Sequence, residues 1–148
     1  MQEPIRDLLQ SGRVLVFISP SATVRETAEL MDRHNVGSVL IMSADNRLEG
    51  IFTERDLVKR VVSTGANPDR TPISDVMTPD VVVVDAKTAA ADVFQLMNMR
   101  KCRHIPVAAG DRILGVVSLR DLLRRDRQMK ELEIEQMRNY FLDPGYPA

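Results

Sequence analysis

The chain has 148 residues, of which 44% are hydrophobic and 28% charged, and its formal net charge at pH 7 is −1. This length suits one domain or two small ones that share a core. The balanced charge and the 4% of aromatic residues argue against a nucleic-acid partner. A single cysteine, Cys102, excludes an internal disulfide framework and is typical of a reducing compartment. The first ten residues do not resemble a signal peptide, and no apolar run approaches the roughly 18 residues of a membrane span, so we expect a cytoplasmic protein.

The first half of the chain predicts the order β-α-β-β-α. An apolar run at 14–18 indicates a buried strand, and the helical spacing over 23–34 indicates a helix whose first turn carries a capping box, formed by Thr23 and Glu26. Two further strands, 38–42 and 47–53, flank a polar turn. A second helix is expected from residue 54 to residue 62.

After a connector rich in Gly, Pro, Asn and Asp, the second half repeats the same order. The expected elements are a strand at 81–84, a helix at 89–100, strands at 104–108 and 112–118, and a helix from 119. Leu30 aligns with Leu96 at an offset of 66 residues, and Gly50 aligns with Gly115 at an offset of 65. An internal repeat therefore organises the chain.

The predicted fold class is α/β (α+β), with two tandem β-α-β-β-α repeats packed as a pseudo-twofold pair, because neither half can bury both faces of its sheet alone. The expected divisions are an N-terminal segment with the first repeat at 1–65, a connector at 66–80, the second repeat at 81–126 and a helical extension at 127–148.

The repeat contains one short motif twice, as GIFTERD at 50–56 and as GVVSLRD at 115–121. One interpretation is structural: a hydroxyl followed three residues later by an acid forms a capping box at a helix start, with Thr53 and Ser118 as the caps. The other interpretation is a binding site. Asp is shorter than the usual Glu of a capping box, so we expect its carboxylate to accept other hydrogen bonds.

Three further features favour the binding site. Gly precedes the hydroxyl by three residues, where a partner can approach the strand closely. The N-terminus of a helix attracts anions through its N–H groups. Arg55 and Arg120 add positive charge. A hydroxyl beside a phosphate and a carboxylate beside a vicinal diol match a ribose phosphate.

These motifs, the repeated element order and the stretch RHIPV at 103–107 resemble a tandem pair of cystathionine β-synthase (CBS) domains, often called a Bateman module. The resemblance covers about residues 14–126. It implies two clefts between the halves that hold adenosine-containing ligands. It also implies that Asp56 and Asp121 bind ribose hydroxyls, while Thr53 and Ser118 lie near ribose or phosphate.

The residues at the start of the second strand of each half differ between the repeats. Arg103 and His104 align with Gly37 and Ser38 of the first half. The resemblance implies that residues at these positions line the clefts and that basic ones meet phosphate, and it assigns Arg103 and His104 to the Asp56 site. The alternatives are a solvated surface charge for Arg103 and an ordinary, partly buried histidine for His104.

The leading functional hypothesis is a stand-alone regulatory module without enzymatic activity, which binds AMP, ADP or ATP and signals occupancy to an unknown effector protein. NAD(H) and S-adenosylmethionine are further candidates, because each contains adenosine. The rivals are a scaffold protein with degenerate clefts and an enzyme acting on a nucleotide. Cys102 lacks an orienting partner for nucleophilic catalysis, and the spacing of His and Cys does not predict a metal site.

A homodimer is also expected, since the helices leave apolar side chains for an interface: Leu57, Val58, Val61, Leu122 and Leu123. The C-terminal helix carries a partial apolar stripe, which packs either on its own module or on a second copy; its members are Leu122, Met129, Leu132, Gln136 and Tyr140. The stretch at 142–148, with two Pro and one Gly, is expected to end this helix.

Overall fold

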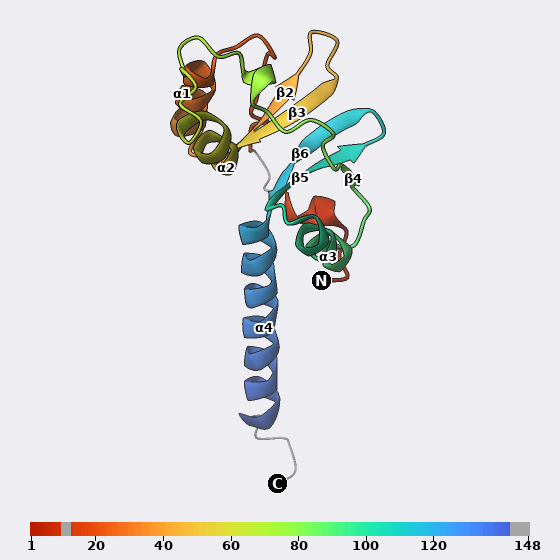
Figure 1. Ribbon diagram of the computed structural model, residues 1–148. Coiled ribbons are helices and arrows are strands. Elements are labelled where there is room, and N and C mark those ends of the chain that lie inside the picture. Colours follow the sequence, from red (N-terminus) through yellow and green to blue (C-terminus); the bar gives the residue numbers. More distant parts are fainter. Residues whose placement is uncertain (10–12, 143–148) are drawn as a thin grey trace. The chain divides into compact units, whose positions relative to one another are not determined.

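The computed structural model describes residues 1–9 and 13–142, apart from the side chain of residue 141 (Figure 1). The chain divides into two compact units, which are described separately below. One unit is Arg13–Val83, and the other consists of Met1–Gly12 together with Val84–Ala148.

The first unit contains a three-stranded sheet with the order β1-β2-β3, in which β1 and β2 are parallel and β2 and β3 are antiparallel. A continuous helical segment follows the last strand; its first turn, α2, is α-helical and the remainder, η2, is π-helical. The bounds are β1 Phe17–Ile18, α1 Val24–His34, β2 Ser38–Met42, β3 Leu48–Thr53, α2 Glu54–Asp56, η2 Leu57–Val62 and a 3₁₀ turn, η3, Ile73–Asp75.

The second unit repeats this sheet with the order β4-β5-β6 and the same strand directions. Its last helix is much longer than its counterpart in the first unit. The bounds are a 3₁₀ turn, η1, Ile5–Leu8, then β4 Val84–Asp85, α3 Ala90–Arg100, β5 His104–Ala109, β6 Arg112–Ser118 and α4 Leu119–Leu142.

The two sheets share an irregularity that confirms the predicted alignment of the repeats. Ile41 pairs with Gly50 while Met42 pairs with Leu48, so one residue of β3 is left without a partner. In the second unit Val107 pairs with Gly115 and Ala108 with Ile113, which leaves out one residue of β6. Each bulge lies immediately before the motif glycine, and the mixed α and β fold class is confirmed.

The helix predicted at 23–34 begins with the predicted capping box. The Thr23 hydroxyl accepts from the Glu26 N–H at 3.1 Å, and the Glu26 carboxylate accepts from the Thr23 N–H at 3.2 Å. The strands predicted at 14–18 and 81–84 are shorter in the structure, with two residues each. Each pairs with a single neighbour, β1 with β2 and β4 with β5.

The short segment that precedes each repeat is itself repeated, which was not predicted from the sequence. PIRDLL at 4–9 and PISDVM at 72–77 are alike at an offset of 68 residues. Each precedes one repeat along the chain but packs on the other repeat. The Ile5 N–H donates to the Thr88 carbonyl at 2.7 Å, and the Ile73 N–H donates to the Ala22 carbonyl at 2.7 Å.

This exchange changes the predicted domain limits. Residues 1–12 were grouped with the first repeat, whereas in the structure they belong to the unit of the second repeat. The physical reason is burial: Ile5 and Ile73 are both fully buried, each in the hydrophobic core of the unit on which it packs. The predicted connector is likewise part of the first unit rather than a linker.

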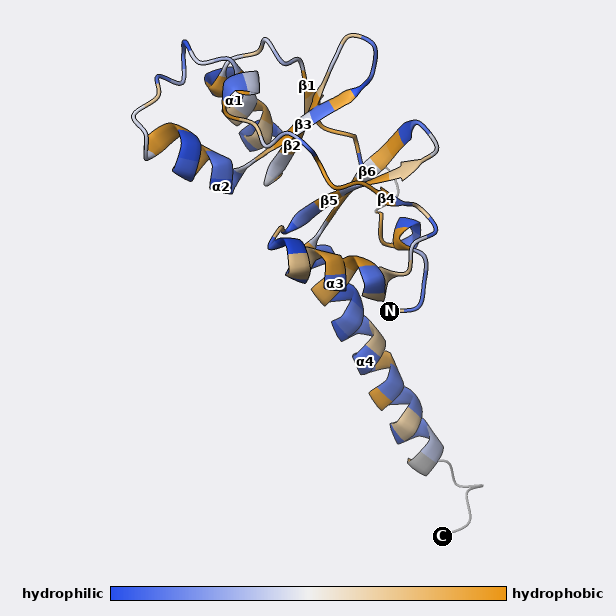
Figure 2. Cartoon of the chain, turned by 45° about the vertical axis from the view of Figure 1, so that its right-hand side comes forward, coloured by the Kyte–Doolittle hydropathy of each residue, from blue (hydrophilic) through white to orange (hydrophobic). Residues whose placement is uncertain are grey.

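The apolar surface expected for dimerisation is partly core. Val61 and Leu122 are buried within their own units, because each faces the sheet that precedes its helix. Val58 and Leu123 are exposed, as expected. Figure 2 shows hydrophobic residues gathered on the strands and on α3, whereas α4 is mostly hydrophilic. None of the described helices combines the length and the apolar character that crossing a bilayer requires.

The second half of α4 lacks packing partners within its unit. Leu122 is fully buried, whereas Leu132 and the other described residues from 130 to 140 are exposed. The prediction that the apolar stripe packs on its own module is therefore confirmed at Leu122 and is not met from residue 130 to residue 140. The helix reaches Leu142, and the rest of the stretch expected to end it, 143–148, lies outside the described residues.

Candidate functional site

The first motif lies where β3 ends and α2 begins. Thr53 is the N-cap of α2, and its hydroxyl accepts from the Asp56 N–H at 3.4 Å. The Asp56 Oδ2 atom accepts from both the Thr53 N–H, at 3.0 Å, and the Thr53 hydroxyl, at 3.2 Å. The structural interpretation is thus confirmed: Asp closes the capping box despite its short side chain.

The other carboxylate oxygen of Asp56 meets two residues that the sequence did not single out. Its Oδ1 atom accepts from the Thr78 hydroxyl at 3.2 Å and lies 3.6 Å from Nε of Arg60. Arg60 also donates to the Met77 carbonyl at 2.7 Å. Asp56 is only 8% exposed, so these contacts hold a buried carboxylate from several sides. Thr78 directly follows the segment at 72–77, whose similarity to 4–9 at an offset of 68 was the available signal.

The second motif has the same local geometry. Asp121 Oδ2 accepts from the Ser118 N–H and from the Ser118 hydroxyl, each at 2.8 Å. The Asp121 N–H donates back to the Ser118 hydroxyl at 3.1 Å. The same three hydrogen bonds therefore hold the carboxylate and the hydroxyl in both copies.

The arginines one turn after each Asp behave differently. Arg60 aligns with Arg125 at an offset of 65 residues. Arg60 faces the motif carboxylate, whereas Arg125 Nε lies 3.2 Å from the carboxylate of Glu3. The amino group of Met1, 2.8 Å away, is the main cause that lowers the pKa of Glu3 to about 2, and Arg125 contributes.

The residues at the start of β2 and β5 lie beside the motif of their own unit. Ser38 pairs with Thr53 in the sheet, and His104 pairs with Ser118. The Gly37 carbonyl accepts from the Glu54 N–H at 3.2 Å. Gly37 is half-buried and Ser38 is buried.

The equivalent contact of the second unit joins the Arg103 carbonyl to the Leu119 N–H at 2.8 Å. Arg103 is exposed and His104 half-buried. The first and third N–H groups of both helices are therefore already bonded, so these helix ends offer an anion fewer donors than expected. Assigning Arg103 and His104 to the Asp56 site joins residues of different units and stays a prediction.

Other segments of the chain pack closely against the two motif glycines. A Cβ atom on Gly50 would collide with the Met77 side chain and lie 3.0 Å from the Thr78 carbonyl, and one on Gly115 would lie 3.1 Å from Leu9. Residues 51 and 78 exchange two backbone hydrogen bonds, of 3.0 and 2.8 Å. The close approach expected at these glycines is thus made by the protein itself, which places Thr78 beside Asp56.

The described residues give little support for a nucleophilic cysteine or a metal site. Burial raises the pKa of the Cys102 thiol, which disfavours the nucleophilic thiolate. Among the described residues no group of three or more His, Cys, Asp or Glu side chains has the arrangement of a metal site. Arg55 and Arg120 are both exposed and lie next to the motif carboxylates in sequence, where they add positive charge.

Comparison with known proteins agrees with this arrangement. The family model described as "CBS domain" matches residues 5–63 and 73–127. An uncharacterized protein of Methanopyrus kandleri is 32% identical over 129 residues, which is 86% of this chain and 66% of that protein. Arabinose 5-phosphate isomerase KdsD of Yersinia pestis is 35% identical over 120 residues, 81% of this chain but only 36% of the isomerase. The chain thus spans less than two thirds of these relatives' length.

A solved structure gives the same result. The crystal structure of a CBS-domain containing protein from Agrobacterium tumefaciens superposes with a TM-score of 0.77 at 33% identity, covering 83% of this chain and 98% of that one. CBS domains generally act as regulatory modules that bind adenosine ligands. With two matched repeats, two units of the same topology and one motif in each, the chain belongs to the CBS-domain family.

Proposed function

We propose that this protein is a regulatory module that binds an adenine nucleotide at its two motifs and signals occupancy to a partner protein. AMP, ADP and ATP are the preferred class, and NAD(H) and S-adenosylmethionine are further candidates. Asp56 and Asp121 accept hydrogen bonds from ribose hydroxyls in this proposal. Thr53, Ser118, Gly37 and Ser38 lie near the ribose and phosphate.

The observation that carries the proposal is the hydrogen bonding of Asp56. A carboxylate has about four acceptor positions. Thr53 uses two of them and Thr78 uses one, at distances of 3.0 to 3.2 Å. The fourth faces Arg60 at the longer distance of 3.6 Å. A ligand hydroxyl that replaces Arg60 at this position forms a charge-assisted hydrogen bond without breaking the capping box.

Phosphate recognition in the proposal depends on exposed arginines. Arg55 and Arg120 follow the cap hydroxyls, and Arg103 precedes β5. Since two N–H groups at each helix start are already bonded, guanidinium groups are the remaining donors that suit a phosphate. His104, half-buried beside Ser118, is the second cation proposed near the phosphate.

The experiment that tests the proposal is calorimetric titration of the 148-residue chain with AMP, ADP, ATP, NADH and S-adenosylmethionine. Saturable binding of at least one ligand is expected. A variant with both Asp56→Asn and Asp121→Asn should bind about ten- to hundredfold more weakly, because a charge-assisted hydrogen bond contributes roughly 1.5–3 kcal/mol. Asp45→Asn, in the exposed turn between β2 and β3, is the matched control. No binding of any ligand at millimolar concentration would contradict the proposal.

The role of Arg103 has its own test. Arg103→Ala should reduce the preference for AMP over adenosine, and this preference should weaken with salt, because the contact is exposed. Arg112→Ala is the matched control, since Arg112 is also exposed but lies at the opposite end of β6 from Ser118. Equal effects of the two substitutions would refute a phosphate role for Arg103.

The proposal includes a homodimer, a cytoplasmic location and no catalytic turnover. The isomerase relatives match through only about a third of their length, so their activity is not transferred to this chain. Incubation of the pure protein with ATP or AMP should leave the nucleotide intact. The rival proposal, a scaffold with degenerate clefts, predicts dimers that bind none of the five ligands.

A further inference from the structure

The distal part of α4, residues 127–142, is a helix with an unusual lack of support. At about 1.5 Å per residue it is roughly 24 Å long, and Figure 1 shows it continuing straight beyond the rest of its unit. Met129 is half-buried, and all its other described side chains are exposed. Helices of this length are marginal in water without tertiary packing. A partner that covers one face would supply the missing stabilisation.

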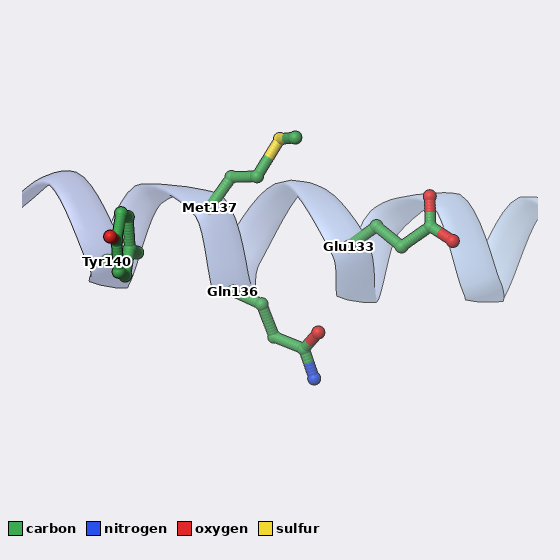
Figure 3. Close-up of a pocket in the computed structure, with 4 residues that line it drawn as sticks. All are labelled: Glu133, Gln136, Met137 and Tyr140. Atoms are coloured by element: carbon green, nitrogen blue, oxygen red, sulfur yellow. The ribbon is translucent and has the colours of Figure 1, made fainter.

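Two exposed apolar side chains on this stretch lie at positions that a coiled coil uses for its seam. Ile134 is 51% exposed and Met137 is 63% exposed. With Arg127 and Lys130 they lie at intervals of three, four and three residues, which places all four along one seam of the helix. Met137 also lines a shallow groove together with Glu133, Gln136 and Tyr140 (Figure 3). The apolar part of the seam therefore consists of Ile134 and Met137.

The charges distinguish the two possible orientations of a second copy. In a parallel pair Arg127 would face Arg127 and Lys130 would face Lys130 across the seam, which is repulsive. In an antiparallel pair, the register that packs Ile134 against Met137 of the other copy brings Glu131 opposite Arg138 of the other copy, twice by symmetry. The seam and the charges therefore agree on one orientation.

The same register also fits the length of the exposed helix. It places residue 129 of one copy opposite residue 142 of the other, so the paired stretch ends where the buried part of α4 begins. Within the described part of the chain, Arg138 forms no ion pair, and Glu131 pairs with Arg127 at 3.1 Å on a fully solvated face. Arg138 is thus available to a second helix, and Glu131 would exchange one exposed ion pair for another.

We infer that residues 127–142 form a self-association surface, on which α4 pairs antiparallel with α4 of a second copy of this chain. Exposed ion pairs contribute little affinity, so Ile134 and Met137 supply the attraction while Glu131 and Arg138 select orientation and register. The inference does not depend on the proposed ligand, because no motif residue takes part.

Charge reversal tests the pairing in the full chain. Sedimentation equilibrium at micromolar concentrations should show that Glu131→Arg and Arg138→Glu each weaken self-association at least about tenfold, since two like-charged contacts arise per dimer. An equimolar mixture of the two variants should associate as strongly as the original chain, because both contacts become complementary. Glu135→Arg, which makes the same charge change on the outer face, should have no effect.

The recovery in the mixture also shows that the variants are folded. Three results would overturn the inference. The first is that the original chain stays monomeric at concentrations on the order of 100 micromolar. The second is equal association of all variants, which assigns the interface to another face. The third is a mixture that remains as weak as the separate variants, which excludes the antiparallel register.

Discussion

At the scale of single residues, the motif Asp has two roles that the sequence presented as alternatives. One oxygen of Asp56 closes the capping box with Thr53, and the other meets Thr78 and Arg60. A residue used in this way cannot be removed without a structural cost, so Asp56→Ala should destabilise the fold as well as any ligand contact. Substitutions that preserve shape, such as Asp→Asn, are the more informative tests of binding.

Thr78 should stabilise the first unit through Asp56. Thr78→Val keeps the shape but removes the hydroxyl that donates to the buried carboxylate, so we expect a loss of about 1–3 kcal/mol. Urea unfolding measures this loss. Thr71→Val is the control, because the Thr71 hydroxyl makes no hydrogen bond among the described residues. Equal losses from both substitutions would show that the contact with Asp56 is unimportant.

Glu3 should make the second unit sensitive to acid. The amino group of Met1, and with it Arg125, lowers the carboxyl pKa from 4.5 to about 2 in the folded state. The resulting stabilisation is complete above pH 4.5 and is lost as the pH falls towards 2. Glu3→Gln should lower stability at pH 7 and flatten its dependence on pH in this window. Glu49→Gln, at an exposed position of β3, should leave the pH profile measured by thermal unfolding unchanged.

At the scale of elements, the exchanged segments connect the two repeats most directly. The 3₁₀ turn η1 packs in the unit of the second repeat, and η3 packs in the unit of the first. Neither segment resembles a strand or a long helix, yet each contributes a fully buried isoleucine and backbone hydrogen bonds to the loop before a helix. Each repeat therefore needs residues that precede the other repeat in the chain.

Substitution of each of the two isoleucines should destabilise only the unit in whose core it is buried. Ile5→Ala and Ile73→Ala each create a cavity in a core, with an expected cost of about 2–5 kcal/mol. Amide hydrogen exchange should show Ile5→Ala reducing protection in β5 and β6, and Ile73→Ala reducing protection in β2 and β3. If either variant reduces protection equally in both sheets, the exchanged segments stabilise the whole chain rather than single units.

At the scale of the whole molecule, each unit carries one copy of the motif with closely similar hydrogen bonds. The copies differ in the partner of the arginine one turn after the motif Asp: Arg60 faces Asp56, whereas the aligned Arg125 faces Glu3. In the proposed regulatory module we therefore expect the two motifs to differ in affinity for the same ligand. A difference of this kind allows one chain to respond to two ranges of ligand concentration.

Stoichiometry should reveal this difference. We expect two ligand molecules per chain at saturation, with Asp56→Asn and Asp121→Asn each weakening a different one of the two binding steps. Calorimetry of each variant measures the number and affinity of the remaining sites. If both substitutions affect the same step, or if the original chain binds a single ligand, the assignment of one site to each motif is wrong.

The amino-acid sequence by itself determined the repeated element order, the strand and helix types and the local geometry of the motif. Periodicity specifies these features because they depend on neighbours within a few residues, as in the capping boxes of Thr23 and Thr53. The bulges of β3 and β6 were not predicted, but they lie at equivalent positions beside the aligned glycines, because a repeated sequence folds into a repeated register. The candidate residues Asp56 and Asp121 followed from the same local signal.

Only the tertiary structure decided which distant residues meet these local motifs. Thr78 lies 22 residues from Asp56, and Glu3 lies 122 residues from Arg125, so no periodic pattern links either pair. The exchange of the segments at 4–9 and 72–77 was likewise invisible to periodicity, since a short 3₁₀ turn has too few residues to show it. Hydrophobic burial determines these contacts, because Ile5 and Ile73 each pack in a core that covers them fully. The order of the elements along the chain does not specify which of the two cores that is.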